Sequence, residues 1–254
     1  MNGPSATLVF LLASGLLLWL LSLRLKDVSI IDIFWGPAIA VVVDIAAWQV
    51  PEVSERGFLA LFLVNLWALR LAFHIWERHR GEDHRYGAMR KKFGAKWWWW
   101  SLFQIFLLQI ILIWLIASPL AAAMAGSSAL GVLDYAGFGL AVLGLGLETA
   151  SDAQLARFRR DPANAGKVMD RGLWAWSRHP NYFGETMLWW GFFLIGIGGG
   201  AAWWTIVSPL IMTVLLLKVS GISMMEDGMD DRRPAYADYK RRVSAFIPWP
   251  PSAQ

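Results

Sequence analysis

Seven long apolar stretches constrain the fold of this chain more than any other feature of its sequence. Each approaches the roughly 20 apolar residues with which an α-helix crosses a bilayer. Hydrophobic residues make up 57% of the 254 residues, which is more than a soluble domain of this length is expected to carry. We therefore expect an all-α integral membrane protein. Its seven transmembrane helices are expected at about residues 7–23, 29–50, 57–76, 101–123, 129–147, 182–197 and 203–222.

Positive charges gather on one side of the predicted membrane. Lys and Arg fill the connections after the first, third and fifth spans and the C-terminal tail, whereas the other side carries only Arg56. Because loops rich in Lys and Arg stay in the cytoplasm, we expect the N-terminus outside and the C-terminus in the cytoplasm. No linker divides the chain. We expect one domain over residues 1–254, with a half on the lipid side (1–125) and a half that binds a cofactor (126–254).

Several kinds of chemistry are excluded by residues that the sequence lacks. It has no cysteine, so disulfides, thiolate nucleophiles and Cys-bound metals are excluded. The four histidines do not have the spacing of metal ligands, so we expect no metal. Neither a dinucleotide fingerprint after a strand nor a Walker motif is present, so a nucleotide would have to bind among helices. We expect the bilayer and a membrane lipid as partners, and neither a nucleic acid nor an obligate protein partner.

Polar residues stand at the entrance to the sixth apolar stretch. Arg178, His179, Asn181 and Glu185 are costly beside hydrocarbon, so a protein that only spanned the bilayer would not place them there. Pro180 disfavours helix at His179, so a helix is expected to start with Asn181 as its N-cap. The N-terminus of such a helix attracts anions. We expect a polar ligand to bind at this entrance.

Two carboxylates and an arginine share one face of the preceding helix. Glu148 and Asp152 are four residues apart, and Arg159 returns to the same face seven residues later. Carboxylates accept hydrogen bonds from ribose hydroxyls, and guanidinium groups bind phosphate oxygens in pairs. This pattern favours a nucleotide site. The alternative is the charged end of a helix at the membrane surface.

Several of these stretches resemble a known superfamily. In the C-terminal half of this chain, the stretches that carry the resemblance are ETASDAQLARFRRD (148–161), SRHPNYFGE (177–185) and RRPAYADYKRRVSAFIPWPP (232–251). These motifs resemble the steroid 5α-reductase C-terminal superfamily, and most closely its bacterial branch, known as the domain of unknown function number 1295. DIFWGP (32–37) and WALRLAFHIWERHRGEDHRY (67–86) are similar to the same branch.

The resemblance implies a seven-helix reductase of the bacterial inner membrane. Such an enzyme uses NADPH, bound on the cytoplasmic side, to reduce a carbon–carbon double bond in a lipid such as a steroid enone or a polyprenol. It implies that Asp152 and Arg159 contact the adenosine and phosphate part, and that Asn181 and Glu185 lie near the ribose or nicotinamide. The full expected set of cofactor-binding residues is Glu148, Asp152, Arg159, Lys167, Arg178, His179, Asn181, Tyr182, Glu185, Glu226, Arg233, Tyr236 and Tyr239.

The N-terminal half departs from the steroid 5α-reductases, which hold an enone ketone with a Gln-Glu pair and a Tyr. The corresponding stretches here read DIFWGP and LWALRL, so a 3-oxo steroid is not expected as the substrate. We expect the proton donor among Asp32, Tyr86 and His179.

Two other functions stay open. Membrane methyltransferases of the isoprenylcysteine and phospholipid type also carry Arg-His-Pro before a helix, then a Glu and Tyr-x-x-Tyr, and bind S-adenosylmethionine. SRHPNYFGE with Glu226, Tyr236 and Tyr239 is compatible with that activity. The remaining alternative is a non-catalytic membrane protein that binds lipid.

Overall fold

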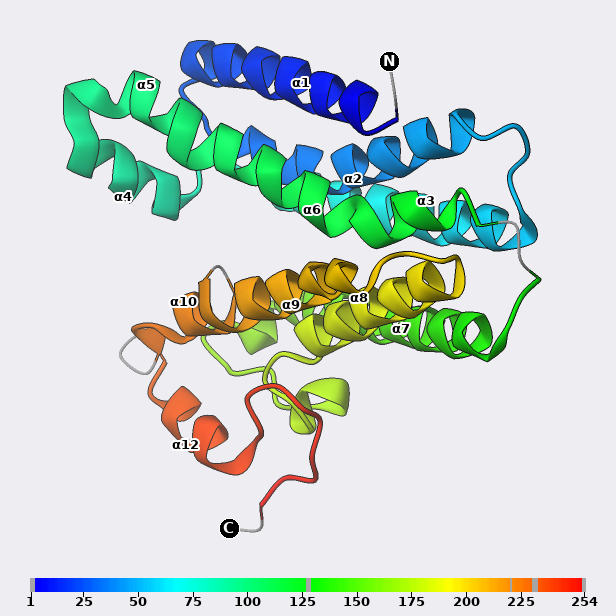
Figure 1. Ribbon diagram of the computed structural model, residues 1–254. Helices are drawn as coiled ribbons and strands as arrows, with labels where there is room; N and C mark the ends of the chain where they lie inside the picture. Colours follow the sequence, from blue (N-terminus) through cyan, green and yellow to red (C-terminus); the bar gives the residue numbers. More distant parts are fainter. Residues whose placement is uncertain (1–2, 127–128, 220, 230–232, 253–254) are drawn as a thin grey trace. The chain divides into compact units, whose positions relative to one another are not determined.

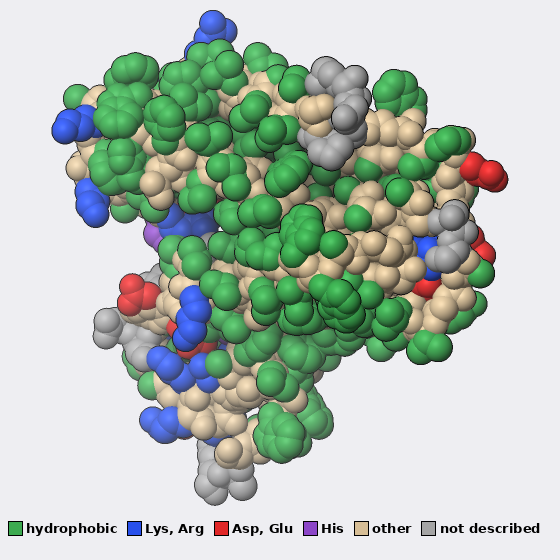
Figure 2. All heavy atoms as spheres, viewed as in Figure 1, with side chains coloured by type: hydrophobic (Ala, Val, Ile, Leu, Met, Phe, Trp, Pro, Cys, Tyr) green, Lys and Arg blue, Asp and Glu red, His purple; other side chains and the backbone are tan. Residues whose placement is uncertain are grey.

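In the computed structural model, which describes residues 3–126, 129–219, 221–229 and 233–252, the chain is a set of helices (Figure 1). No strand occurs among these residues. Six helical segments are long and apolar enough to cross a membrane, and hydrophobic side chains cover much of the visible surface (Figure 2). The all-α prediction is confirmed, and the apolar helices suggest an integral membrane protein. The six segments are Ser5–Leu25, Ile30–Trp48, Glu55–Arg78, His84–Ala123, Val132–Arg160 and Trp203–Glu226.

Two compact units make up the chain. The N-terminal unit comprises Met1–Asp134 and Ile195–Ser208, and the C-terminal unit comprises Tyr135–Leu194 and Pro209–Gln254. The α-helices are α1 (Gly3–Leu25), α2 (Ile30–Trp48), α3 (Glu55–Arg78), α4 (His84–Phe93), α5 (Trp97–Ser101), α6 (Leu108–Ala123), α7 (Val132–Arg160), α8 (Pro180–Gly198), α9 (Val207–Val214), α10 (Ile222–Glu226) and α12 (Ala235–Arg242). Short 3-10 or π segments are η1 (Gly94–Lys96), η2 (Leu102–Leu107), η3 (Pro162–Asn164), η4 (Gly172–Ala175), η5 (Trp203–Ile206) and η6 (Leu215–Val219).

α8 corresponds to the sixth predicted span but is not among the six apolar segments, because polar residues and glycines lower its hydropathy. The helix begins at Pro180, whose fixed φ suits the first helical position. The expectation that Asn181 caps this helix is therefore wrong. The cap position falls on His179, whose carbonyl oxygen accepts a hydrogen bond from the backbone N–H of Phe183 at 3.2 Å.

The core of the N-terminal unit is built around α2, which packs against α1, α3 and α6. Fully buried side chains of this core include Ile39 and Val43 on α2, Trp67 on α3 and Ile113 on α6. Because α2 is enclosed by three neighbours, the polar residue in its first turn, Asp32, is brought close to side chains from other elements.

An ion pair with both side chains only 1% exposed lies in the N-terminal unit, at the starts of α3 and α7. Arg56 donates to both carboxylate oxygens of Asp134, from Nε at 2.6 Å and from Nη2 at 2.7 Å. The same guanidinium donates to the carbonyl oxygen of Ala129 at 3.2 Å, and the backbone N–H of Gly131 donates to Asp134 at 2.8 Å. Both charges are therefore paired and further hydrogen-bonded, which burial requires of them.

In the C-terminal unit, glycines allow α7 and α8 to pack backbone to backbone. A Cβ added at Gly144 would lie 2.5 Å from the carbonyl oxygen of Gly184, and a Cβ at Gly184 would lie 2.6 Å from the carbonyl oxygen of Gly144. No other residue fits at either position without a shift of the helices. Small residues at such contacts are typical of helix pairs in membranes. The close approach brings the carboxylates of α7, Glu148 and Asp152, beside the first turns of α8.

The end of the chain folds back onto the segment that precedes α8. We call residues 243–252 the C-terminal strap. The backbone N–H of Arg178 donates to the carbonyl oxygen of Ser244 at 2.8 Å, and that of Trp249 donates to the carbonyl oxygen of Trp176 at 2.9 Å. The Ser177 hydroxyl also donates to the carbonyl oxygen of Phe246 at 2.8 Å. The C-terminal strap therefore holds α12 close to the start of α8.

Candidate functional site

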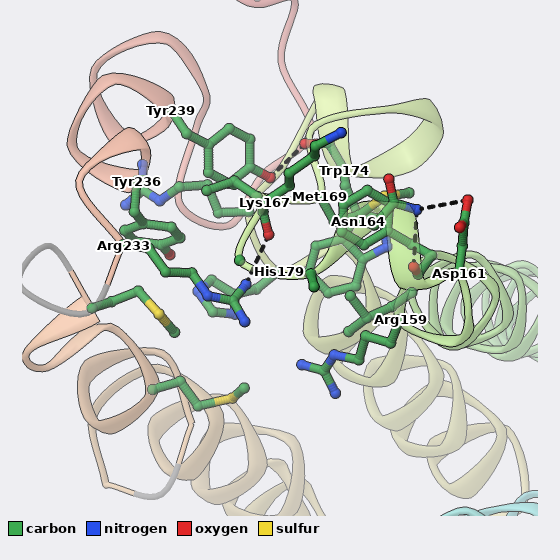
Figure 3. Close-up of a pocket in the computed structure, with 18 of the residues that line it drawn as sticks. Arg159, Asp161, Asn164, Lys167, Met169, Trp174, His179, Arg233, Tyr236 and Tyr239 are labelled. Carbon is green, nitrogen blue, oxygen red and sulfur yellow. Dashed lines mark hydrogen bonds between the residues drawn. The ribbon is translucent and has the colours of Figure 1, made fainter.

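A pocket of about 230 Å³ lies in the C-terminal unit (Figure 3). Its walls come from the end of α7, the loop 161–169, the segment before α8, and the region from α10 to α12. Four positively charged side chains line it, together with Trp174, two tyrosines and three methionines. The pocket is smaller than the ~300–1,000 Å³ of typical small-molecule sites, so it would accommodate a small ligand or one part of a larger one. The positive residues are Arg159, Lys167, Arg178 and Arg233.

Three of these positive residues come from separate elements. Arg159 lies in the last turn of α7, Lys167 in the following loop, and Arg233 just before α12. Arg233 donates through Nη1 to the carbonyl oxygen of Lys167 at 3.0 Å, which links the loop to the start of α12. Figure 3 shows the guanidinium groups of Arg159 and Arg233 beside the same cavity. This arrangement suits an anionic ligand that carries more than one phosphate.

The fourth positive residue, Arg178, is held by the protein itself. Its Nε and Nη2 donate to the two oxygens of Glu226 at 2.7 and 3.1 Å. Its Nη1 donates to the carbonyl oxygens of Lys240 and Val243 at 3.1 and 2.6 Å. The guanidinium is thus fully engaged with α10 and α12. These contacts fix the wall of the pocket.

Glu226 also contacts His179 and Tyr236 through its Oε1 atom. His179 Nε2 lies 3.0 Å from Oε1 of Glu226, and the Tyr236 hydroxyl donates to the same oxygen at 3.0 Å. Burial, and then the negative charge of Glu226, raises the pKa of Tyr236. Burial raises the pKa of Tyr239 as well, and its hydroxyl donates to the carbonyl oxygen of Trp174. Both phenols therefore stay protonated and act as hydrogen-bond donors at neutral pH.

We expect the variant Glu226→Ala to loosen the region from α10 to the C-terminal strap. It leaves the donors of Arg178, His179 and Tyr236 without their shared acceptor, and stranding a buried donor costs roughly 1–3 kcal/mol. Thermal unfolding should start at a lower temperature, and proteolysis should remove the C-terminal tail faster. As a control, Asp238→Ala removes only ion pairs at the surface of α12, with Arg241 and the half-buried Arg242, and should change little. Equal behaviour of the two variants would contradict the anchoring role of Glu226.

The carboxylates of α7 meet the first turns of α8. Asn181 donates from Nδ2 to Oδ1 of Asp152 at 3.1 Å. The other side-chain atom of this amide, Oδ1, is buried and has no donor among the described residues. Glu148 and Glu185 are 3% and 8% exposed. A buried acceptor of this kind fits a ligand that presents a hydroxyl or an amide N–H.

Most of the predicted cofactor-binding residues thus lie in one region of the C-terminal unit. Tyr182 stacks on the ring of His179 with the centroids 5.6 Å apart, and its hydroxyl lies 3.0 Å from the sulfur of Met225. Seven of the predicted residues line the pocket: Arg159, Lys167, Arg178, His179, Arg233, Tyr236 and Tyr239.

Asp32 and Tyr86, two of the three expected proton donors, lie together in the N-terminal unit. The Tyr86 hydroxyl donates to Oδ1 of Asp32 at 2.8 Å and accepts from Nε2 of Gln109 at 3.2 Å. Arg85 donates to the other oxygen of Asp32 at 3.2 Å. The tyrosine is 7% exposed. Neither Asp32 nor Tyr86 lines the pocket described above, whereas the third candidate, His179, does.

A second layer of contacts fixes this cluster. Asp83 caps α4 by accepting from the backbone N–H of Arg85 at 2.9 Å, and it also accepts from the Arg85 side chain at 2.8 Å. Burial disfavours the charged form of Asp83, but these hydrogen bonds outweigh it and lower the pKa of Asp83. The backbone N–H of Asp83 donates to the Ser29 hydroxyl at 2.6 Å, which ties the start of α4 to the start of α2.

The comparisons with known proteins decide the family. The model of the family DUF1295, whose description is "Protein of unknown function", matches residues 18–243 of this chain. The chain belongs to the DUF1295 family. A similar protein is an uncharacterized protein of Schizosaccharomyces pombe, 28% identical over 92% of this chain and 76% of the relative. No solved structure matches. The DUF1295 match includes the pocket and the Asp32–Tyr86 cluster, and it ends at the first residue of the C-terminal strap.

Proposed function

We propose that this DUF1295 protein is a membrane-embedded reductase that uses NADPH to saturate a carbon–carbon double bond in a lipid. The observation that carries the proposal is the pocket in which Arg159, Lys167 and Arg233 converge from three separate elements. NADPH carries a 2′-phosphate and a pyrophosphate, and this set of positive charges suits such a ligand. The resemblance of the motifs around the pocket to steroid 5α-reductases supplies the reaction class.

The topology belongs to the same proposal. α8 is a further span beside the six apolar segments, which makes seven in all. The N-terminus lies outside, and the C-terminus and the pocket lie on the cytoplasmic side of a bacterial inner membrane. The distribution of Lys and Arg supports this orientation. The lipid substrate would reach the site from the bilayer.

The residues of the C-terminal unit fit the parts of the cofactor. Arg159, Lys167 and Arg233 would hold the phosphates, and the buried Oδ1 of Asn181 would accept from a hydroxyl or amide N–H. The carboxylates of Asp152 and Glu185 would accept from ribose hydroxyls. When bound, NADPH supplies the hydride. The chain has to hold both reactants in a dry, fixed arrangement.

The proton for the reduced bond would come from the Asp32–Tyr86 cluster. Addition of hydrogen to a carbon–carbon double bond requires one hydride and one proton. Tyr86 would turn its hydroxyl from Asp32 to the substrate and give it the proton, and Asp32, once protonated from the solvent, would return a proton to Tyr86. The hydrogen bond of 2.8 Å between the two groups allows such a transfer. Gln109 and Arg85 would keep the two groups aligned.

One observation favours a second candidate, an S-adenosylmethionine-dependent methyltransferase. Arg178, His179 and Tyr236 all contact Glu226, and the motifs that contain these residues also resemble membrane methyltransferases. S-Adenosylmethionine has no phosphate and carries a positive charge at sulfur. The three positive residues around the pocket therefore favour NADPH over it. A non-catalytic lipid-binding protein is the remaining alternative and requires no cofactor.

We expect NADPH, and not S-adenosylmethionine, to raise the melting temperature of the purified protein. A ligand that binds only the folded state adds about 2.7 kcal/mol at 100 times its Kd. The variants Arg159→Ala, Lys167→Ala and Arg233→Ala each remove one charged donor, worth about 1.5–3 kcal/mol, so NADPH affinity should fall roughly 10- to 100-fold.

A matched control is Arg241→Ala, which removes an exposed arginine of α12 that does not line the pocket. NADPH affinity should be unchanged in this variant. Stabilisation by S-adenosylmethionine alone would replace the reductase proposal by the methyltransferase. No stabilisation by either compound would favour the non-catalytic alternative.

A further inference from the structure

The C-terminal strap forms a closed loop with an apolar tip. At its base, the backbone N–H of Ser252 donates to the carbonyl oxygen of Arg242 at 3.0 Å. On one side of the tip, the ring of Phe246 packs edge-on against Phe183 of α8, with centroids 5.4 Å apart. On the other side, Ile247 and Trp249 are 60% and 69% exposed. The loop is thus fixed at its base and on one side, and it presents large apolar side chains outward.

The exposed tip continues onto the segment before α8. The Trp249–Trp176 hydrogen bond joins the backbones of the two residues, and Trp176 is 47% exposed. Trp176, Ile247 and Trp249 form what we call the tryptophan patch. The patch is rigidly built, because Ser177 and Arg178 also bind the strap through hydrogen bonds. Large apolar side chains held in this way mark a surface that contacts something other than water.

The position of the tryptophan patch along α7 indicates what it contacts. Trp174 donates from Nε1 to the carbonyl oxygen of Ser151 at 3.0 Å, so the segment before α8 packs at this level of α7. The apolar run of α7 ends at Leu147. At 1.5 Å per residue, Ser151 lies about 6 Å beyond that end. Headgroup layers extend roughly 5–8 Å beyond the hydrocarbon core on each side. With the hydrocarbon boundary at Leu147, the patch is at the level of the headgroups.

Charge near the tryptophan patch complements an anionic membrane. The last turn of α12, which leads into the strap, holds Lys240, Arg241 and Arg242, whereas the strap itself carries no charge. Figure 2 shows Lys and Arg side chains gathered over the region of α12. Trp is enriched at membrane interfaces, and basic residues beside such a site are attracted to anionic lipids.

We propose that the tryptophan patch inserts into the headgroup layer of an anionic phospholipid bilayer, the bilayer that α7 crosses. The C-terminal strap then anchors α12, and with it Tyr236 and Tyr239 of the pocket wall, to the membrane surface. This anchoring does not depend on the reaction that the pocket supports. It requires only that α7 spans the bilayer.

The absence of cysteine from the sequence allows a direct test with single-cysteine labels. Ile247→Cys places an environment-sensitive fluorophore on the tip of the strap. Ala163→Cys places the same label on an exposed residue of the loop after α7, beyond Arg160 and about 20 Å past Leu147. Each full-length variant is reconstituted in vesicles of phosphatidylglycerol with phosphatidylcholine, and in phosphatidylcholine alone. Because Ile247 is exposed, the substitution should not disturb folding, and Trp249→Cys provides a second site on the same tip.

In vesicles with phosphatidylglycerol, the label at position 247 should emit at shorter wavelength and be quenched by lipids that carry a quencher near the headgroup. The label at position 163 should be quenched by iodide in the buffer instead. The shift at 247 should decrease in phosphatidylcholine alone. Iodide quenching at 247 equal to that at 163 would overturn the proposal, and so would an identical shift in both lipids. A disulfide between two copies formed through position 247 would also overturn it, because a second copy would then cover the patch.

Discussion

The variant Asp134→Ala should lower the melting temperature of the detergent-purified protein by on the order of 10 °C. Both side chains of the Arg56–Asp134 pair are 1% exposed, so removal of the carboxylate leaves a buried guanidinium without its counter-charge. Breaking a buried pair in this way costs about 3–5 kcal/mol. For a domain of this size, each kcal/mol corresponds to roughly 2–4 °C. Thermal unfolding followed by intrinsic fluorescence measures the shift.

Two further variants distinguish the contribution of charge pairing from that of packing around the ion pair. The double variant Arg56→Met/Asp134→Leu removes both charges together, and apolar replacements of similar volume are often neutral, so most of the lost stability should return. Gly198→Ala should also be destabilising, because a Cβ at this position would lie 2.6 Å from Oδ1 of Asp134. A double variant as unstable as Asp134→Ala would mean that packing, and not charge pairing, accounts for the loss.

A partly exposed carboxylate on α2 provides the matched control. Asp44 accepts one hydrogen bond, from Nδ2 of Asn65 at 2.9 Å, and both residues are half-buried. Asp44→Ala should therefore shift the melting temperature much less than Asp134→Ala. Similar shifts in the two variants would contradict the special role of the buried pair.

The fold class followed from the sequence because a long apolar run can adopt few structures in a membrane. In a bilayer, backbone polar groups must be satisfied within the segment, so each run had to form a helix. The carboxylates of α7 were also predictable. Glu148, Asp152 and Arg159 recur at helical spacing, and α7 does continue through all three residues to Arg160. The length of the apolar runs was sufficient in the first case, and helical spacing in the second.

The partners of the site residues could not be predicted, because they depend on contacts between distant segments. Arg178 lines the pocket, as expected of a residue at the predicted site, but its bond to Glu226, which is 48 residues away, was not predicted. A sequence does not distinguish an arginine that binds phosphate from one that binds a carboxylate. Arg85 was missed for a similar reason: GEDHRY has the composition of a solvated loop, and only the packing of α4 against the start of α2 brings Arg85 to Asp32, which is 53 residues away.

The N-cap of α8 was predicted at the wrong residue because two local preferences compete there. Asn is a favourable N-cap residue, and Pro is favourable at the first helical position. Pro180 precedes Asn181, so when proline takes the first position, Asn181 falls inside the helix. Its side chain is then available to bind Asp152 of α7, which links α8 to the neighbouring helix. The sequence alone could not predict this contact, because it depends on which helices pack together.

The variant Tyr86→Phe should reduce lipid reduction roughly 100- to 10,000-fold, the usual contribution of a positioned proton donor. It removes the hydroxyl that lies between Asp32 and Gln109 while keeping the ring, which is 7% exposed. Asp32→Asn should have an effect of similar size, because the amide cannot supply a proton to Tyr86. Turnover is measured with NADPH and a panel of enone and polyprenol lipids, following the loss of nicotinamide absorbance.

Measurement of NADPH binding distinguishes a role of Tyr86 and Asp32 in proton transfer from a role in folding. Tyr86 and Asp32 do not line the pocket, so both variants should keep the NADPH-dependent rise in melting temperature. Gln109→Ala removes the donor to the Tyr86 hydroxyl, and its effect on turnover should be smaller, since the hydrogen bond from Tyr86 to Asp32 remains. If Tyr86→Phe turned over at the unaltered rate, the proton would have to come from another group, and His179 would be the next residue to replace. If turnover and NADPH stabilisation were lost together, the cluster would instead be a structural element of the N-terminal unit.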